Sequence, residues 1–368
     1  MDALSPSLTG IGRYTWELAQ RLPLHPRLQG VQFYRNGRWV DEPARLLQAT
    51  LAIPKPKTSK PRWQLKQPRW LRDWRITSGC RGKVFHGPNF FLPPCAEAGV
   101  ATVHDLSVFK YPETHPIERI KHFEREFTAS MTRAAHLVTD SEATRQEVIK
   151  YLAWPAEKIT AVPLGVSSQF APTAEATLAP CLAKYDLTFK CYALCVSTLE
   201  PRKKIANLLQ AYQCLPPPVR TKYPLVLIGS AGWLSESLHK EIDRLKSQGW
   251  IRYLGFVPEA DLPALYAGAQ SFIYPSVYEG FGLPVLEAMA SGVPVVASIF
   301  SSLPEVTQGA AQLVDPDDID ALASGIHASL CDEPWRATAC KAGLIVAQGF
   351  TWDRCIDQTV DVYKKVMR

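Results

Sequence analysis

The chain of 368 residues lacks any long apolar run. A membrane-spanning helix needs roughly 20 consecutive, mostly apolar residues, and no stretch approaches that length. The opening MDALSPSLTG has neither the basic start nor the apolar core of a secretory signal peptide. No repeat of the solenoid kind is present. These absences argue against integral membrane, secreted and repeat proteins, and we expect a cytoplasmic globular protein.

The cysteines show no pairing pattern. There are nine of them, an odd number, scattered along the chain without a Cys-x-x-Cys pair. This spacing argues against a disulfide framework and against a zinc site, and it fits a reducing compartment. We therefore expect neither structural disulfides nor a bound metal.

The net charge of +6 is modest but unevenly spread. Residues 54–83 contain ten basic residues and a single acid, Asp73, with Trp63, Trp70 and Trp74 interleaved among the bases. Bases on lipid headgroups and indoles at the interface suit an anionic membrane surface. A solvated loop is the plain alternative, and nucleic-acid binding through phosphate contacts and stacking is the least favoured one.

Apolar runs that indicate buried strands alternate with helical patterns in both halves of the chain. This alternation predicts an α/β fold with parallel sheets covered on both faces, and the length suits two domains. We expect domains at residues 1–175 and 176–348, and a final helix within 349–368. Segment 171–190, which contains Pro172 and Pro180, is the predicted interdomain linker.

The most informative segment is EGFGLPVLEAMA, residues 279–290. Glu279 and Glu287 bracket a Gly-x-Gly turn, which allows close backbone approach to a ligand, and Pro284 suits the first turn of a helix. The amides of a helix N-terminus attract phosphate, while carboxylates can hold sugar hydroxyls. The segment therefore predicts a sugar-nucleotide site, the alternative being an ordinary loop–helix junction.

With its surroundings, YEGFGLPVLEAMASGVPVVAS resembles the donor-site signature of the large retaining glycosyltransferase family with the GT-B architecture (group 1, GT4-type). The resemblance covers almost the whole chain and is most specific between Glu200 and Val296. It implies two Rossmann-like domains that face each other across a cleft, with the terminal helix crossing back to the first domain. It also implies a metal-independent transfer of a hexose with retention at the anomeric carbon.

The resemblance assigns roles in the second domain. Glu279 would contact the donor sugar at the reacting face, and Glu287 would accept both ribose hydroxyls. Lys203 and Arg202, in the turn TLEPRKK, would stabilise the leaving diphosphate. Ser197 stands where many relatives carry a further arginine. The remaining expected donor contacts are the backbone of Gly229, Gly280, Phe281, Gly282 and Leu283.

In the first domain, the resemblance assigns backbone amides of Gly10 and Gly12, in TGIGR, to the diphosphate. His104, in TVHDLS, would face the reacting carbon, where a neutral imidazole can donate to the sugar or orient the acceptor hydroxyl. Asp105 would orient His104 or cap the following turn. For the segment VTDSE, residues 138–142, a helix-capping role suffices.

The segments resemble most those of bacterial mannosyl- and rhamnosyltransferases of surface polysaccharide assembly. GDP-mannose is therefore the expected donor, ahead of a GDP- or dTDP-linked deoxyhexose and of UDP-sugars. The implied partner is a glycan or lipid-linked glycan acceptor, reached at the inner face of the cytoplasmic membrane through residues 54–83.

Members of this family usually open with a buried strand before the Gly-x-Gly loop, and here Met1-Asp2-Ala3 stands in its place. We therefore expect the first sheet to lack its first strand. Two alternatives follow: a catalytically impaired, truncated protein of this fold that acts as a binding partner, and a sugar-nucleotide epimerase that shares the cleft.

Overall fold

The computed structural model describes residues 1–5, 8–48, 78–80, 82–94, 98–230, 232 and 235–367. Most of the basic segment 54–83 lies outside these residues, so its predicted contact with membranes stays a prediction. Within the described residues, none of the helices is both long enough and apolar enough to cross a membrane.

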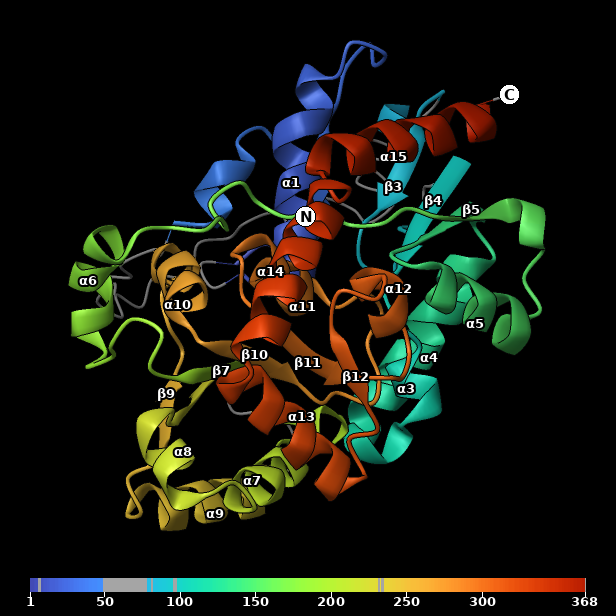
Figure 1. Cartoon of the computed structure of the whole chain (residues 1–368). Coiled ribbons are helices and arrows are strands. Elements are labelled where there is room, and N and C mark those ends of the chain that lie inside the picture. The colour runs from blue at the N-terminus through green and yellow to red at the C-terminus, as the bar shows by residue number, and fades with distance from the viewer. Residues whose placement is uncertain are drawn as a thin grey trace, which may run out of the picture.

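The first half of the chain forms a parallel sheet of four strands in the order β3-β4-β5-β6 (Figure 1). The strands are β3 (Val84–Gly87), β4 (Ala98–Val103), β5 (Ala134–Thr139) and β6 (Ile159–Ala161). The helices of this half are α1 (Gly10–Arg21), α3 (Ser107–Lys110), α4 (Ile117–Met131) and α5 (Glu142–Leu152). In the described residues before α1, Met1–Ser5 contain no strand. A separate antiparallel hairpin pairs β1 (Phe33–Arg35) with β2 (Arg38–Val40).

The second half forms a parallel sheet of six strands in the order β9-β8-β7-β10-β11-β12. Numbered within the sheet, this is the Rossmann order 3-2-1-4-5-6. Its strands are β7 (Ala193–Val196), β8 (Leu225–Ile228), β9 (Ile251–Gly255), β10 (Ser271–Tyr274), β11 (Val295–Ser298) and β12 (Gln312–Val314). The strand order reverses between β7 and β10, and ligands of such sheets bind at the carboxyl ends of the strands at this switch point.

Helices cover both faces of the second sheet (Figure 1). They are α7 (Ile205–Gln213), α8 (Pro217–Lys222), α9 (Glu236–Lys246), α10 (Leu262–Gly268), α11 (Leu283–Ala290), α12 (Leu303–Thr307), α13 (Ile319–Cys331) and α14 (Glu333–Gln348). Strands β8, β10 and β11 are buried along their whole length, as expected for apolar runs in a parallel sheet.

The predicted linker, residues 171–190, includes the helix α6 (Glu175–Lys184). Pro180 lies inside this helix, although proline usually ends or kinks one. Burial of Leu178 and Leu182, together with the packing of α6 on α10, supplies the tertiary contacts that override this local preference.

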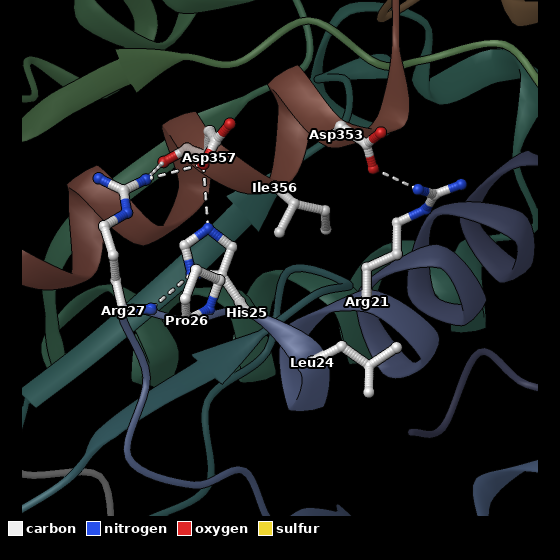
Figure 2. Close-up of a pocket in the computed structure, with 8 residues that line it drawn as sticks. All are labelled: Arg21, Leu24, His25, Pro26, Arg27, Asp353, Ile356 and Asp357. Carbon is white, nitrogen blue, oxygen red and sulfur yellow. Dashed lines mark hydrogen bonds and ion pairs between the residues drawn. The ribbon is translucent and has the colours of Figure 1, made fainter.

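The last helix, α15 (Trp352–Met367), packs on α1 and on the strands β3, β4 and β5 of the first sheet (Figure 1). Figure 2 shows the ion pairs that bind α15 to residues 21–27 beside a cavity of about 400 Å³. Asp357 accepts hydrogen bonds from Arg27 and His25, both at 3.0 Å, and Asp353 pairs with Arg21. These ion pairs are partly exposed, so each contributes little stability by itself.

Candidate active site

The switch point of the second sheet carries a cluster of opposite charges. Lys203 lies in the turn after β7, and Glu279 lies in the loop after β10. The Lys203 ammonium pairs with Oε1 of Glu279 and donates to the Tyr274 hydroxyl at 3.1 Å. Arg202 Nη1 lies 3.7 Å from Oε2 of Glu279 and donates to the Tyr278 carbonyl at 2.8 Å. Residues 76 positions apart are thus brought together by the parallel order of β7 and β10.

The protonation states of this cluster follow from its burial and its charges. Burial acts to raise the pKa of Glu279, but Lys203 and Arg202 outweigh it, and the net shift is downward. Burial lowers the pKa of Lys203, and the Arg202 charge adds to this effect against the opposing pull of Glu279. Glu279 is therefore an ionised, acceptor-only group at neutral pH, suited to sugar hydroxyls.

Serine side chains fix the loop that carries Glu279. Ser302 donates to the Phe281 carbonyl at 2.6 Å and to the Glu279 carbonyl at 3.0 Å, while Ser301 accepts from the Glu279 amide at 3.0 Å. Gly282 has φ +112°, a conformation that favours glycine, and it immediately precedes α11. The loop therefore reaches the helix start in one defined conformation.

Helix α11 begins at Leu283 with Pro284 in its first turn, as predicted, and Glu287 lies one turn further on. Gly292, with φ +69°, follows the end of the helix. The Glu287 carboxylate pairs with Arg13, which comes from α1 in the other half of the chain. Arg13 also donates to Glu259 at 2.9 Å through Nη2 and at 3.1 Å through Nε. The sequence reasoning missed Arg13, although it directly follows the glycine loop TGIG.

The two halves of the chain meet at Gly280. A Cβ atom there would lie 1.7 Å from the His104 carbonyl oxygen, so the loop touches the backbone that follows β4. The Gly280 carbonyl accepts from Ser141 at 2.7 Å and from Thr144 at 3.1 Å. Glu305, from α12, accepts from the first amides of α5 at 2.9 and 3.0 Å. The segment VTDSE thus caps its helix through Ser141, as predicted, and also binds the loop that contains Gly280.

His104 is buried with both ring nitrogens bonded inside the protein. Nδ1 lies 2.6 Å from Oδ2 of Asp140, and Nε2 donates to the Pro88 carbonyl at 2.8 Å. Burial acts to lower the pKa of His104, but Asp140 outweighs it and the net shift is upward. Of the two roles predicted for Asp105, capping of the following turn is the one that the structure shows, because Asp105 accepts from the Ser107 amide at 2.8 Å. Asp140, in VTDSE, was missed.

The predicted glycines differ in how closely other atoms approach them. The Gly12 amide donates to the side chain of Thr9, the N-cap of α1, at 3.2 Å, while Gly10 lies in open space at the helix start. Gly229 ends β8 with φ +143°, and a Cβ there would lie 1.9 Å from the Ser197 carbonyl. Gly229 is thus required by the contact between the ends of β7 and β8.

A cavity of about 570 Å³ lies beside the charge cluster, between the two halves of the chain. It shares Arg202 with the cluster, and its aromatic lining includes Tyr111, Tyr278 and Phe300. Its lining charges pair with each other, as Lys110 does with Glu147 and Lys204 with Asp317. Within the described part of the chain, no group of three His, Cys, Asp or Glu side chains is placed to hold a metal ion.

Comparison with known proteins shows which proteins this chain resembles. Residues 188–343, which include both charge-bearing loops, match the family described as "Glycosyl transferases group 1". The chain is 40% identical over 366 residues to the O-antigen chain mannosyltransferase B of Escherichia coli, and the match covers 97% of this chain and 96% of that protein. It is 28% identical to the O-antigen chain mannosyltransferase RfbU of Salmonella typhimurium over 61% of this chain and 59% of that one.

Solved structures share the architecture. The HepE protein of Anabaena, in complex with UDP and glucose, superposes with a TM-score of 0.66 at 21% identity, covering 80% of this chain and 81% of that one. WaaG, a glycosyltransferase involved in lipopolysaccharide biosynthesis, superposes with a TM-score of 0.64 at 14% identity, covering 80% of each chain. The expected GT-B fold, with two Rossmann-like parallel sheets, is confirmed.

Proposed function

Because this chain belongs to the group 1 glycosyltransferase family, we propose that it transfers mannose from GDP-mannose to a saccharide acceptor with retention at the anomeric carbon. A glycosyltransferase of this family takes its sugar from a nucleotide sugar. The choice of mannose is supported by the 40% identity, over nearly the full length, to an O-antigen chain mannosyltransferase. Rhamnose is the second choice, because the sequence segments also resemble those of bacterial rhamnosyltransferases.

The observation that carries the reaction class is the cluster of Lys203, Arg202 and Glu279 at the switch point. Lys203 uses two of its three N–H donors on Glu279 and Tyr274, so one donor is left for a diphosphate oxygen. In the proposed mechanism, Lys203 and Arg202 stabilise the negative charge that develops on the leaving diphosphate. Glu279 accepts sugar hydroxyls, and the departing diphosphate takes the proton of the attacking acceptor hydroxyl.

The cavity beside Arg202 supports an acceptor that is itself a saccharide. Aromatic rings offer apolar faces to the C–H side of a sugar, while paired carboxylates, lysines and hydroxyls at the rim offer hydrogen-bond partners. Phe300 is 38% exposed at this cavity, which leaves an aromatic surface open to a ligand. We propose a growing glycan, carried on a lipid at the inner face of the cytoplasmic membrane, with residues 54–83 as the membrane contact.

The test is a donor series of GDP-mannose, dTDP-rhamnose and UDP-glucose with mannose oligosaccharides as acceptors, read by product mass and by the anomeric coupling in NMR spectra. Glu279→Gln should reduce turnover by about 100-fold or more while it changes the Kd for GDP little, since it removes a contact to the sugar. Glu287→Gln should instead weaken GDP binding by about tenfold. Turnover equal to that of the parent in both variants would refute the site assignment.

The two alternatives give other results in the same assay. An epimerase would convert the nucleotide sugar in the absence of an acceptor, and an impaired protein would bind nucleotide poorly and form no product.

A further inference from the structure

Arg13 joins the two halves of the molecule at the carboxylate that the proposed function assigns to the donor ribose. It lies in the first turn of α1, and its guanidinium pairs with Oε1 of Glu287 in α11. The same guanidinium donates to Oε1 of Glu259 at 2.9 and 3.1 Å, and it stacks 5.6 Å from the centre of the Phe170 ring. Arg13 therefore contacts Glu287, Glu259 and Phe170, and Glu287 is the one expected to bind the donor ribose.

The three charged side chains differ in their exposure. Arg13 and Glu287 are 12% and 6% exposed, whereas Glu259 is 45% exposed. A buried carboxylate has to be neutralised or hydrogen-bonded, because an unpaired buried charge costs several kcal/mol. In this structure Arg13 meets this requirement for Glu287. Ribose hydroxyls meet it equally well when they donate to the same oxygens.

Arg13 and a ribose therefore compete for one carboxylate. A ribose that donates both hydroxyls to Glu287 has to share the carboxylate with Arg13, whose guanidinium already lies against Oε1. We propose that Arg13 competes with the donor nucleotide by standing in for the ribose on Glu287, and that nucleotide binding shifts Arg13 fully onto Glu259. This inference rests on the proposed function, to which it adds the regulation of donor entry.

The position of this contact supports such a role. Other contacts between the two halves lie away from Glu287, and one group of them surrounds Gly280, where Ser141, Thr144 and Glu305 bind across the boundary. These bonds engage backbone groups and leave Glu287 untouched. Loss of the Arg13–Glu287 pair would therefore release the contact between the halves at Glu287, while the contacts around Gly280 remain. Donor binding and the state of this pair are then coupled reciprocally.

The test compares the Kd for GDP in the parent, Arg13→Gln and Glu259→Gln by isothermal titration calorimetry. Arg13→Gln removes the competitor, so GDP should bind about tenfold tighter, within the 5- to 150-fold that such couplings usually reach. Glu259→Gln removes the charge that receives the displaced Arg13, so GDP should bind about tenfold more weakly. The two variants of one ion-pair network thus shift the Kd in opposite directions.

Arg21→Gln is the matched control, because Arg21 lies on the same helix and pairs with Glu17 and Asp353 outside the site. It should leave the Kd unchanged. Weaker or unchanged GDP binding in Arg13→Gln would overturn the inference and make Arg13 a direct donor contact or a bystander. Glu259→Gln keeps the test decisive if Arg13→Gln does not fold, since tighter or unchanged binding there also overturns it. A parent that binds none of the donor nucleotides would refute the proposed function itself, and this inference with it.

Discussion

Replacement of Gly280 by alanine should separate catalysis from nucleotide binding. The added Cβ would lie 1.7 Å from the His104 carbonyl oxygen and 2.7 Å from its carbonyl carbon. Carbon–oxygen contacts normally begin at about 3.3 Å, so the two backbones must separate by about 1.5 Å. Both atoms that clash belong to the main chain, and no side-chain rotation can relieve the contact. The loop that carries Glu279 must therefore move away from the strand end at His104.

Such a displacement should lower both the turnover rate and the stability of the protein. Misplacement of catalytic groups by about 1 Å can reduce a rate by about 100-fold, and we expect at least this loss in kcat. Overpacking of this kind typically destabilises a protein by about 1–3 kcal/mol. Glu287 lies on α11 and is not part of the clash, so its expected contact with the nucleotide is kept. The Kd for GDP should therefore change by less than about threefold.

Initial rates over a range of donor concentrations, together with GDP titrations and thermal unfolding, measure these three quantities. Gly30→Ala is the control, since a Cβ at Gly30 meets no atom within 4 Å. A Gly280→Ala protein with parental kcat would show that the two halves do not meet at this loop during turnover, and the reasoning would fail.

Two further predictions concern the pH dependence of stability at His104, which is buried, and at His86, which is partly buried. Asp140 raises the pKa of His104, so this pair contributes stability that is complete below pH 6.5 and is lost as the pH rises through the folded-state pKa. Asp140→Asn should therefore destabilise the protein most at acidic pH, as thermal midpoints between pH 5.5 and 8.5 would show; an equal loss at every pH would contradict it. His86, which bonds Tyr363 at 2.6 Å and Thr102 at 2.8 Å, has its pKa lowered to about 3 by burial. A lowered pKa costs stability below pH 6.5, by up to about 2 kcal/mol at pH 5. In urea titrations, the His86→Gln variant should therefore lose less stability than the parent between pH 7 and pH 5. An equal loss in the variant and the parent would refute this.

Local patterns in the sequence were sufficient to predict most helices and strands and the turn between Glu279 and α11. Apolar runs such as LVLI in β8 and VVAS in β11 have the composition and length of buried parallel strands. Pro284 and Gly292 mark the two ends of α11 through backbone preferences that depend on neighbouring residues alone. The parallel fold and the meeting of Lys203 with Glu279 at one sheet edge follow from these elements and their order along the chain.

Contacts between residues far apart in sequence were decided only by the tertiary structure. Asp140 rather than Asp105 orients His104, because the side chains at the ends of β4 and β5 point to a common edge while Asp105 caps its own turn. Pro180 lies inside a helix because packing on α10 outweighs its local preference. Arg13 reaches Glu287 across 274 residues, and no local pattern encodes such a pairing. Backbone preferences are set by adjacent residues, whereas charge pairing depends on which surfaces the folded sheets bring together.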